Sequence, residues 1–282
     1  IHCQYLFKGC EILDIVPFRI TRDSDLDVDE EDMENLLKEI EISLRKRKRG
    51  ASVRLEILKT RNQSIKKFLA ENLDLTEQAI YEINGPLGVT CFFKFIKLLN
   101  EPKWEFEPFV PQKPLELPKM DNLFDRIREH DILFHHPYES FEAVIKLVSD
   151  AANDPNVLAI KQALYRVSGN SPIVGALAKA AENGKQVTVL VELKARFDEE
   201  NNIIWARRLE KAGCHVIYGL MGLKTHAKII LIVRKEPDGI KRYVHLGTGN
   251  YNDNTAKLYT DIGLMTANDQ FGSDASAFFN LL

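Results

Sequence analysis

Two short motifs in the second half of the sequence could together form a phosphate site that contains a nucleophile. The first is Lys224-Thr225-His226-Ala227-Lys228, and the second runs from His245 to Asn252 as His-Leu-Gly-Thr-Gly-Asn-Tyr-Asn. On an extended strand, residues two apart such as His226 and Lys228 point to the same face. A turn rich in Gly, Thr and Asn can offer backbone N–H and amide donors to that face. The two motifs therefore predict a site where an imidazole meets a phosphate.

The sequence between the motifs predicts how they come together. Residues 229–233 form a continuous apolar run, which is typical of a buried strand. Pro237-Asp238-Gly239 is a turn signal, and residues 242–244 would return the chain as a second strand. We therefore expect a β-hairpin that brings the Gly247-Thr248-Gly249-Asn250 turn beside His226.

His226 is the candidate nucleophile, because a neutral imidazole nitrogen aimed at a phosphorus atom can form a phosphohistidine. Lys228 would stabilise the charge that develops during the transfer. A carboxylate should fix the tautomer of His226. Asp261 is the best placed by sequence order, and Glu192 is the alternative.

Three further polar residues belong to the second motif. His245 could be a second acid or base, or could only hydrogen-bond the turn. Asn250 and Asn252 are expected to donate to phosphate or to the loop itself.

The elements around the motifs alternate between strand and helix. We expect strands over residues 157–165, 186–193 and 214–218, and helices over residues 172–182 and 201–211. This alternation predicts an α/β domain with a largely parallel sheet flanked by helices, in which ligands gather beyond the carboxyl ends of the strands. Arg166 and Arg196 each follow a strand end, where a guanidinium can bind phosphate oxygens two at a time.

The first part of the chain carries no evident chemistry. We expect helices over residues 29–49, 75–83 and 90–99 and a strand over residues 52–58. The basic run at residues 45–49 complements the dipole of its own helix, so it does not require nucleic acid. Asp23, Asp25 and Asp27 resemble a calcium loop, but Val28 stands where such a loop needs glycine. Pro108, Pro111, Pro114 and Pro118 then predict an extended linker over residues 107–119.

These motifs carry two family resemblances. In the phospholipase D superfamily an H-x-K motif is followed by a strand and then by a G-S-x-N turn. This chain resembles that pattern, with Thr248 in place of the Ser and Val233 in place of the usual aspartate. Three longer segments are more specific: LAIKQALYRV at residues 158–167, ELKARFDE at residues 192–199, and residues 245–261 ending in Leu-Tyr-Thr-Asp. In this order they resemble bacterial-type polyphosphate kinases, and the resemblance extends over the whole chain, including FRITRD at residues 18–23.

The resemblance implies an enzyme that reversibly transfers the γ-phosphoryl group of ATP to inorganic polyphosphate. It implies a phospholipase D-like catalytic domain over residues 120–282, the first of a pair, after a smaller helix-rich α+β middle domain over residues 1–106. It assigns Tyr259 to ATP contact and Arg166 and Arg196 to the Mg²⁺ site. Since a guanidinium cannot ligate a cation, we interpret the arginines as contacting Mg²⁺ through bound phosphate. A homo-oligomer is also expected, as are flanking domains without which this piece should be weak or inactive.

Composition limits the classes of protein to which this chain could belong. The 282 residues hold 38 Lys and Arg against 41 Asp and Glu, a net charge of -3, so no global basic field attracts a polyanion. The four cysteines show no paired spacing, and no run is long enough to span a membrane. We expect a cytoplasmic protein; the resemblance also allows peripheral association with a membrane, for which no sequence feature speaks.

Two other functions remain open at this stage. A phospholipase D-like phosphodiesterase needs two H-x-K motifs per active site, and one is present. A non-catalytic module that binds polyphosphate would need the arginines but not His226.

Overall fold

The computed structural model describes residues 3–24, 36–47, 50–60, 62–107, 109–117, 119, 121–193, 195, 198–219 and 223–282. The chain divides into two units, one made of residues 1–27 and 42–107 and the other of residues 28–41 and 108–282. Helix α2 (Leu36–Arg47) runs across this division and forms the described part of the helix predicted over residues 29–49. Within the described ranges, no helix is long and apolar enough to cross a bilayer.

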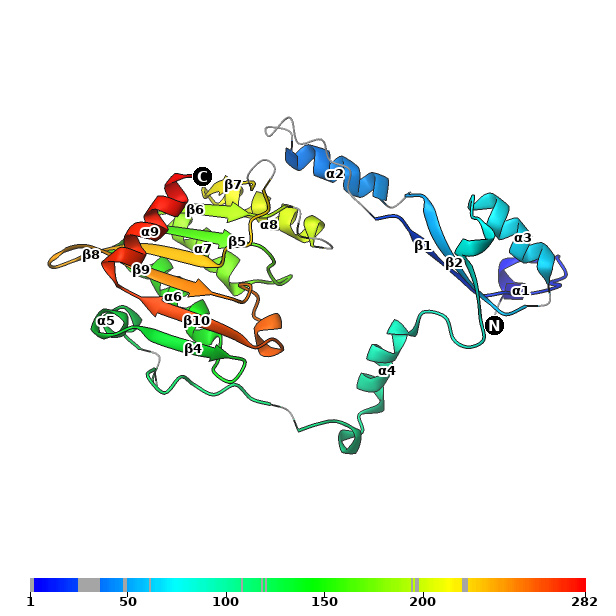
Figure 1. Cartoon of the computed structure of the whole chain (residues 1–282), viewed down its shortest axis with the longest axis horizontal. Helices are drawn as coiled ribbons and strands as arrows, with labels where there is room; N and C mark the ends of the chain where they lie inside the picture. The colour runs from blue at the N-terminus through cyan, green and yellow to red at the C-terminus, as the bar shows by residue number, and fades with distance from the viewer. Residues whose placement is uncertain are drawn as a thin grey trace. The chain divides into compact units, whose positions relative to one another are not determined.

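The smaller unit contains a three-stranded sheet in the order β1-β2-β3 (Figure 1). Its strands are β1 (Phe18–Arg22), β2 (Ser52–Leu58) and β3 (Ile80–Ile83). The strand predicted over residues 52–58 is confirmed as β2, which pairs antiparallel with β1 and parallel with β3. The other elements of this unit are α1 (Cys3–Leu6), α3 (Gln63–Asn72), η2 (Glu77–Ala79), η3 (Val89–Cys91), α4 (Phe92–Leu99) and η4 (Pro102–Trp104).

The prediction of a helix over residues 75–83 is wrong. Residues 75–83 form the single turn η2 and then strand β3, because Ile80 and Ile83 pair beside β2 and become partly buried there. Pairing with a distant strand overrides local preference in so short a segment. The helix predicted over residues 90–99 is present as η3 and α4.

The larger unit is built on a seven-stranded sheet in the order β4-β10-β9-β8-β5-β6-β7 (Figure 1). Its strands are β4 (Ile132–His136), β5 (Val157–Leu164), β6 (Gln186–Val191), β7 (His215–Ile217), β8 (Ile229–Glu236), β9 (Gly239–Gly247) and β10 (Asp261–Thr266). The expected α/β architecture, a large sheet flanked by helices, is confirmed, and so is the β8–β9 hairpin.

The expectation of a largely parallel sheet needs a correction, because the sheet is mixed. Only the β5–β6 and β6–β7 pairings are parallel among the described strands of this larger sheet. The tight turn between β8 and β9 permits only an antiparallel pair, and β10 and β4 continue that pattern to the edge. Nevertheless β4, β9, β5, β6 and β7 all run in one direction, opposite to β8 and β10.

Helices cover both faces of this sheet. The helices are α5 (Leu123–Glu129), α6 (Glu142–Asn153), α7 (Pro172–Glu182), α8 (Glu199–Lys211) and α9 (Asp269–Asn280), with the single turn η5 (Thr255–Lys257). Helix α9 packs on one face, where Phe279 and Ala275 join a core with Leu231 and Val244. Helices α6 and α7 lie on the other face (Figure 1).

The sequence of α7 sets both of its ends. Ser171 caps the first turn by accepting a hydrogen bond from the N–H of Val174, and Pro172 stands at the first helical position, where no N–H is needed. Gly184 ends the helix with a positive φ of 82°, which glycine adopts without strain. The helix predicted over residues 172–182 is therefore confirmed at both boundaries.

Candidate functional site

The direction of the strands brings the predicted site residues to one edge of the large sheet. Strands β4, β5, β6 and β9 end at this edge, whereas β8 and β10 begin there. Accordingly the segments after β5, β6 and β9 and before β8 and β10 share this edge. They carry Arg166, Glu192, the Gly-Thr turn (Gly247-Thr248-Gly249-Asn250), the pair His226 and Lys228, and Asp261.

The expectation that His226 and Lys228 lie on a strand is wrong, because both residues lie in the segment before β8. Both side chains nevertheless reach the same neighbour, Tyr165. The His226 and Tyr165 rings meet edge to face with centroids 5.3 Å apart, and Nζ of Lys228 lies 5.3 Å from the centre of the Tyr165 ring. The two side chains therefore meet at Tyr165, although not through the alternation of a strand.

Tyr165 lies among the predicted site residues but was not one of them. Besides Lys228, Nζ of Lys224 and the guanidinium carbon of Arg166 each lie 5.8 Å from the centre of its ring. A cation near the face of an aromatic ring is attracted by the ring quadrupole. Tyr165 is therefore a shared neighbour of three cationic groups and of His226. Its place directly after a buried strand, next to Arg166, was the signal that could have revealed it.

Lys228 is held rigidly beside the imidazole that it would assist. Its side chain is buried, and its ammonium donates a hydrogen bond to the carbonyl of His226 at 2.5 Å. Burial lowers the pKa of Lys228, and the negative charge of Asp261 partly offsets that effect. The ammonium retains further N–H donors for an anion.

The imidazole of His226 is exposed. Within the described residues it makes no hydrogen bond to either of the carboxylates that were considered as its partners. Oε2 of Glu192 accepts from the backbone N–H of Thr225 at 2.6 Å, so this buried carboxylate fixes the segment that leads into His226. Asp261 instead accepts from the Gly-Thr turn.

Thr248 and Asp261 join that turn to the start of β10. The Thr248 hydroxyl donates to Oδ1 of Asp261 at 2.8 Å, and the N–H of Ile262 donates to the Thr248 oxygen at 3.0 Å. Gly249 lies against the same carboxylate, because a Cβ at that position would lie 2.4 Å from Oδ2 of Asp261. The turn therefore requires glycine at this position.

The two asparagines of the second motif differ in their surroundings. Oδ1 of Asn252 accepts from the N–H groups of Asn254 and Thr255 at 3.1 Å each, so its oxygen stabilises the loop. Oδ1 of Asn250 is buried and faces a small cavity. The phosphate role expected for these residues stays a prediction.

His245 lies in β9, one strand from His226, and is buried. Its Nδ1 lies 2.8 Å from the hydroxyl of Tyr251. Burial lowers the pKa of His245 from its ordinary 6.5 to about 3. His245 is therefore neutral near pH 7.

The arginines and Tyr259 complete the predicted set. Arg166 pairs with Asp198, with 2.5 Å between Nε and Oδ2, and more than a third of its side chain is exposed. Arg196 lies outside the described residues. Tyr259, which is 65% exposed, follows η5.

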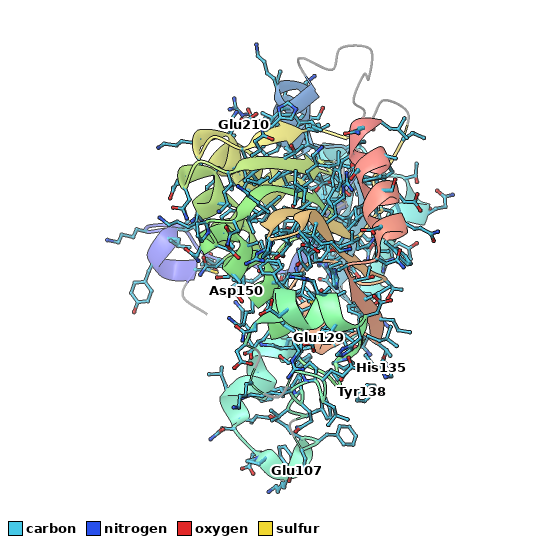
Figure 2. The ribbon with its side chains drawn as sticks, turned by 90° about the vertical axis from the view of Figure 1, so that its left-hand side faces the viewer. Glu107, Glu129, His135, Tyr138, Asp150 and Glu210 are labelled. Carbon is cyan, nitrogen blue, oxygen red and sulfur yellow. The ribbon has the colours of Figure 1, made fainter. Side chains whose placement is uncertain are left out.

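His136 was not among the predicted site residues. It is the buried last residue of β4, directly before Pro137. His135 is exposed, and Figure 2 shows it beside Tyr138 at the surface. The alternation of Ile132, Phe134 and His136 on one face was the available signal.

The site was tested for residues that could hold Mg²⁺ directly. The described ranges contain no group of three or more His, Cys, Asp or Glu placed to hold a metal ion. Asp198 is paired with Arg166, and Asp261 is engaged by Thr248. The Mg²⁺ site that the resemblance implies therefore stays a prediction.

The known proteins that this chain resembles are polyphosphate kinases. Residues 122–282 match the family model described as polyphosphate kinase C-terminal domain 1, and residues 1–95 match the polyphosphate kinase middle domain. The polyphosphate kinase of Halalkalibacterium halodurans is 56% identical over 99% of this chain, and that of Bacillus anthracis is 55% identical over 98%. The crystal structure of polyphosphate kinase from Porphyromonas gingivalis matches 99% of this chain with a TM-score of 0.74 and 29% identity.

The chain spans about 40% of the length of each of these three relatives. The two family models together cover most of its residues. This chain belongs to the polyphosphate kinase family.

Proposed function

We propose that the protein containing this chain is a polyphosphate kinase that works through a phosphohistidine on His226. The enzyme would transfer the γ-phosphoryl group of ATP to the end of an inorganic polyphosphate chain, reversibly. One observation carries this proposal: the exposed imidazole of His226 meets the ring of Tyr165, and the cationic groups of Lys224, Lys228 and Arg166 approach the same ring. Cationic groups that share a neighbour with the nucleophile fit an anionic phosphorus centre.

In the first step, a ring nitrogen of His226 attacks the γ-phosphorus, a P–N bond forms, and the bond to the ADP oxygen breaks. In the second step, a terminal oxygen of polyphosphate attacks the same phosphorus and the P–N bond breaks. Each step exchanges one bond to phosphorus for another, so the sequence can run in either direction. Lys228, desolvated and fixed by its bond to the His226 carbonyl, would stabilise the charge in both steps.

The other predicted site residues have roles in the same scheme. Arg166 would exchange its ion pair with Asp198 for phosphate oxygens, together with Arg196 from the neighbouring strand end. Asn250 would donate from its amide nitrogen, while Asn252 holds the loop. Asp261 would hold the Gly-Thr turn and balance Lys228, and Tyr259 would contact ATP. His245, buried in β9, would donate to a water molecule that positions Asn250.

Mg²⁺ would enter as part of the nucleotide or polyphosphate substrate, where it neutralises phosphate charge. The chain's own residues would then bind the phosphate oxygens that the ion leaves free.

The organisation of the whole protein is part of the proposal. Residues 1–106 would form a middle domain, 107–119 a linker and 120–282 a catalytic domain that works with further domains in a homo-oligomer. The partners would be ATP, ADP and polyphosphate, without nucleic acid. The four cysteines are free thiols, which fits a reducing cytoplasm.

The test is conversion of γ-labelled ATP to acid-insoluble polyphosphate by the complete protein, and ATP formation from ADP and polyphosphate. Both reactions should require His226 and be unaffected by His215→Ala, which alters an exposed histidine on β7. Release of inorganic phosphate or hydrolysis of a phosphodiester, without polyphosphate synthesis, would instead identify a hydrolase. The isolated chain should turn over far more slowly than the complete protein, and equal rates would refute its dependence on further domains.

A further inference from the structure

A small cavity lies against the Gly-Thr turn. Its volume is about 10 Å³, and its polar lining consists of the side chains of His136, His245, Asn250 and Asp261. Nε2 of both histidines and Oδ1 of Asn250 are buried, and none of these atoms has a hydrogen-bond partner within the described residues. Three unpartnered polar atoms beside one cavity need a common explanation, because each unpaired buried group is costly.

The surroundings of His136 determine which of its nitrogens carries the proton. Its ring stacks parallel on Phe134, with centroids 5.9 Å apart, and meets Phe141 edge to face at 5.4 Å. Nδ1 lies 2.8 Å from the carbonyl oxygen of Glu139, which can only accept. Nδ1 must therefore carry the proton, and in the neutral ring Nε2 presents a lone pair.

His245 has the opposite tautomer. Burial raises the pKa of Tyr251 well above its ordinary value, so its hydroxyl stays protonated and donates to the nearer acceptor, Nδ1 of His245 at 2.8 Å. The other acceptor, the His245 carbonyl, is 3.5 Å away. Since Nδ1 accepts, Nε2 of the neutral ring carries the proton.

Gly263 shows that the two Nε2 atoms face the same space. A Cβ built on this residue would lie 3.0 Å from Nε2 of His245 and 3.5 Å from Nε2 of His136. Only a glycine in β10 leaves this space open. One nitrogen is a donor and the other an acceptor, so a single bridging group could satisfy both.

We propose that one water molecule binds in this cavity, accepts from Nε2–H of His245 and donates to Nε2 of His136 and Oδ1 of Asn250. A water needs roughly 10–15 Å³ and two to four polar partners. The cavity offers about that volume, and its three unpartnered atoms supply one donor and two acceptors, beside the Asp261 carboxylate that Thr248 already engages. All hydrogen atoms in this network are then paired.

The water makes His136 a positioning residue for the Gly-Thr turn. By holding Oδ1 of Asn250 inward, it directs the amide NH₂ of Asn250 outward, where it can donate to a phosphate. This functional consequence rests on the proposed function, whereas the water site itself does not. His136, at the end of the edge strand β4, thereby acts through the water without touching the substrate.

The water and the tautomers can be observed directly. A crystal structure of the chain at a resolution that shows individual waters should contain density within hydrogen-bond distance of all three atoms. NMR of the chain with ¹⁵N-labelled histidine should find the proton on Nδ1 of His136 and on Nε2 of His245. A dry cavity, or the same tautomer at both residues, would overturn the water site.

Two variants of His136 test the positioning role. His136→Phe keeps the ring contacts but removes the acceptor, whereas His136→Gln keeps an acceptor oxygen. We expect affinity for inorganic tripolyphosphate to fall about fivefold in the first variant and to stay near wild type in the second. His135→Phe alters the exposed neighbour shown in Figure 2 and should change nothing. Equal losses in both His136 variants would show a merely structural role and overturn the positioning inference.

Gly263→Ala provides a second route that leaves His136 intact. The added methyl group would enter the space between the two Nε2 atoms and displace the water. The same loss of tripolyphosphate affinity is expected, and unchanged affinity in a folded variant would count against the inference. If the complete protein makes no polyphosphate while the water and both tautomers are observed, the proposed function fails and the water site stands.

Discussion

The hydroxyl of Thr248 donates a hydrogen bond to Oδ1 of Asp261, which fixes the Gly-Thr turn to the first residue of β10. The same oxygen of Thr248 accepts from the N–H of Ile262. A hydroxyl both donates and accepts here, so a threonine serves where the phospholipase D pattern has a serine. The carboxylate that had been considered for orienting His226 is engaged by the turn.

Replacing this hydroxyl should destabilise the larger unit. Thr248→Val keeps the branched shape but removes both hydrogen bonds, and should lower the free energy of unfolding by about 1 kcal/mol. Thr248→Ser keeps both bonds and should stay within about 0.5 kcal/mol of wild type. Urea denaturation of the two variants provides the comparison, and equal stabilities would mean that the bonds do not hold the turn.

Gly249 should tolerate no side chain. The Cβ of alanine would lie 2.4 Å from Oδ2 and 2.6 Å from Cγ of Asp261, so the carboxylate or the turn must move. We expect Gly249→Ala to reduce phosphoryl transfer at least about tenfold, since small misplacements of a site are costly. Gly169→Ala is the matched control, because a Cβ there meets nothing within 4 Å. If both variants transfer phosphoryl groups equally well, the turn is not part of the site.

The stability of the chain should depend on pH through His245. Its pKa is lowered from 6.5 to about 3 on folding, chiefly by burial, so the unfolded chain binds a proton that the folded chain does not. Stability should therefore fall as the pH drops below about 6.5, by up to about 1.4 kcal/mol per pH unit for one proton, until about pH 3.

The measurement is the free energy of unfolding of wild type and His245→Gln between pH 7 and pH 4. The difference between the two curves should change by about one proton's slope across this range. His215→Gln, at an exposed position, should leave the slope unchanged. Parallel curves for wild type and His245→Gln would show that His245 is protonated in the folded chain.

Arg166 should contribute to phosphate binding by its geometry as well as by its charge. Arg166→Lys preserves the charge but loses the paired donors, and we expect it to recover only part of the affinity for tripolyphosphate lost in Arg166→Ala. Arg126→Ala, which breaks the exposed ion pair with Glu129, is the control and should have little effect. Isothermal titration at two salt concentrations separates the contribution of charge from that of the paired donors. Full recovery of the affinity for tripolyphosphate in Arg166→Lys would show that charge alone matters.

Local patterns predicted the parts of the fold that lie close together in sequence. The β8–β9 hairpin followed from an apolar run and a Pro-Asp-Gly turn, and α7 followed from its own caps. The strands β4 and β10 were not predicted, because each is stabilised by pairing with residues far away in the sequence, such as Phe134 with Gly263. The mixed sheet was missed for the same reason.

The residues of the candidate site could also be predicted only in part from the sequence. The motif residues from His226 to Asn252 could be assembled from sequence because one hairpin joins them. Tyr165 and His136 could not, since their contacts with Lys228 and with the cavity beside His245 depend on the order of strands in the sheet.

The measurement that tests the central claim most directly is covalent labelling of the complete protein. The protein is incubated with γ-labelled ATP and Mg²⁺ as wild type, as His226→Ala and as the control His215→Ala. Wild type and His215→Ala should carry label that survives alkali, is lost in acid and can be chased into polyphosphate, while His226→Ala should carry none. Polyphosphate synthesis at the wild-type rate by folded His226→Ala would contradict the phosphohistidine mechanism and indicate direct transfer between the two substrates.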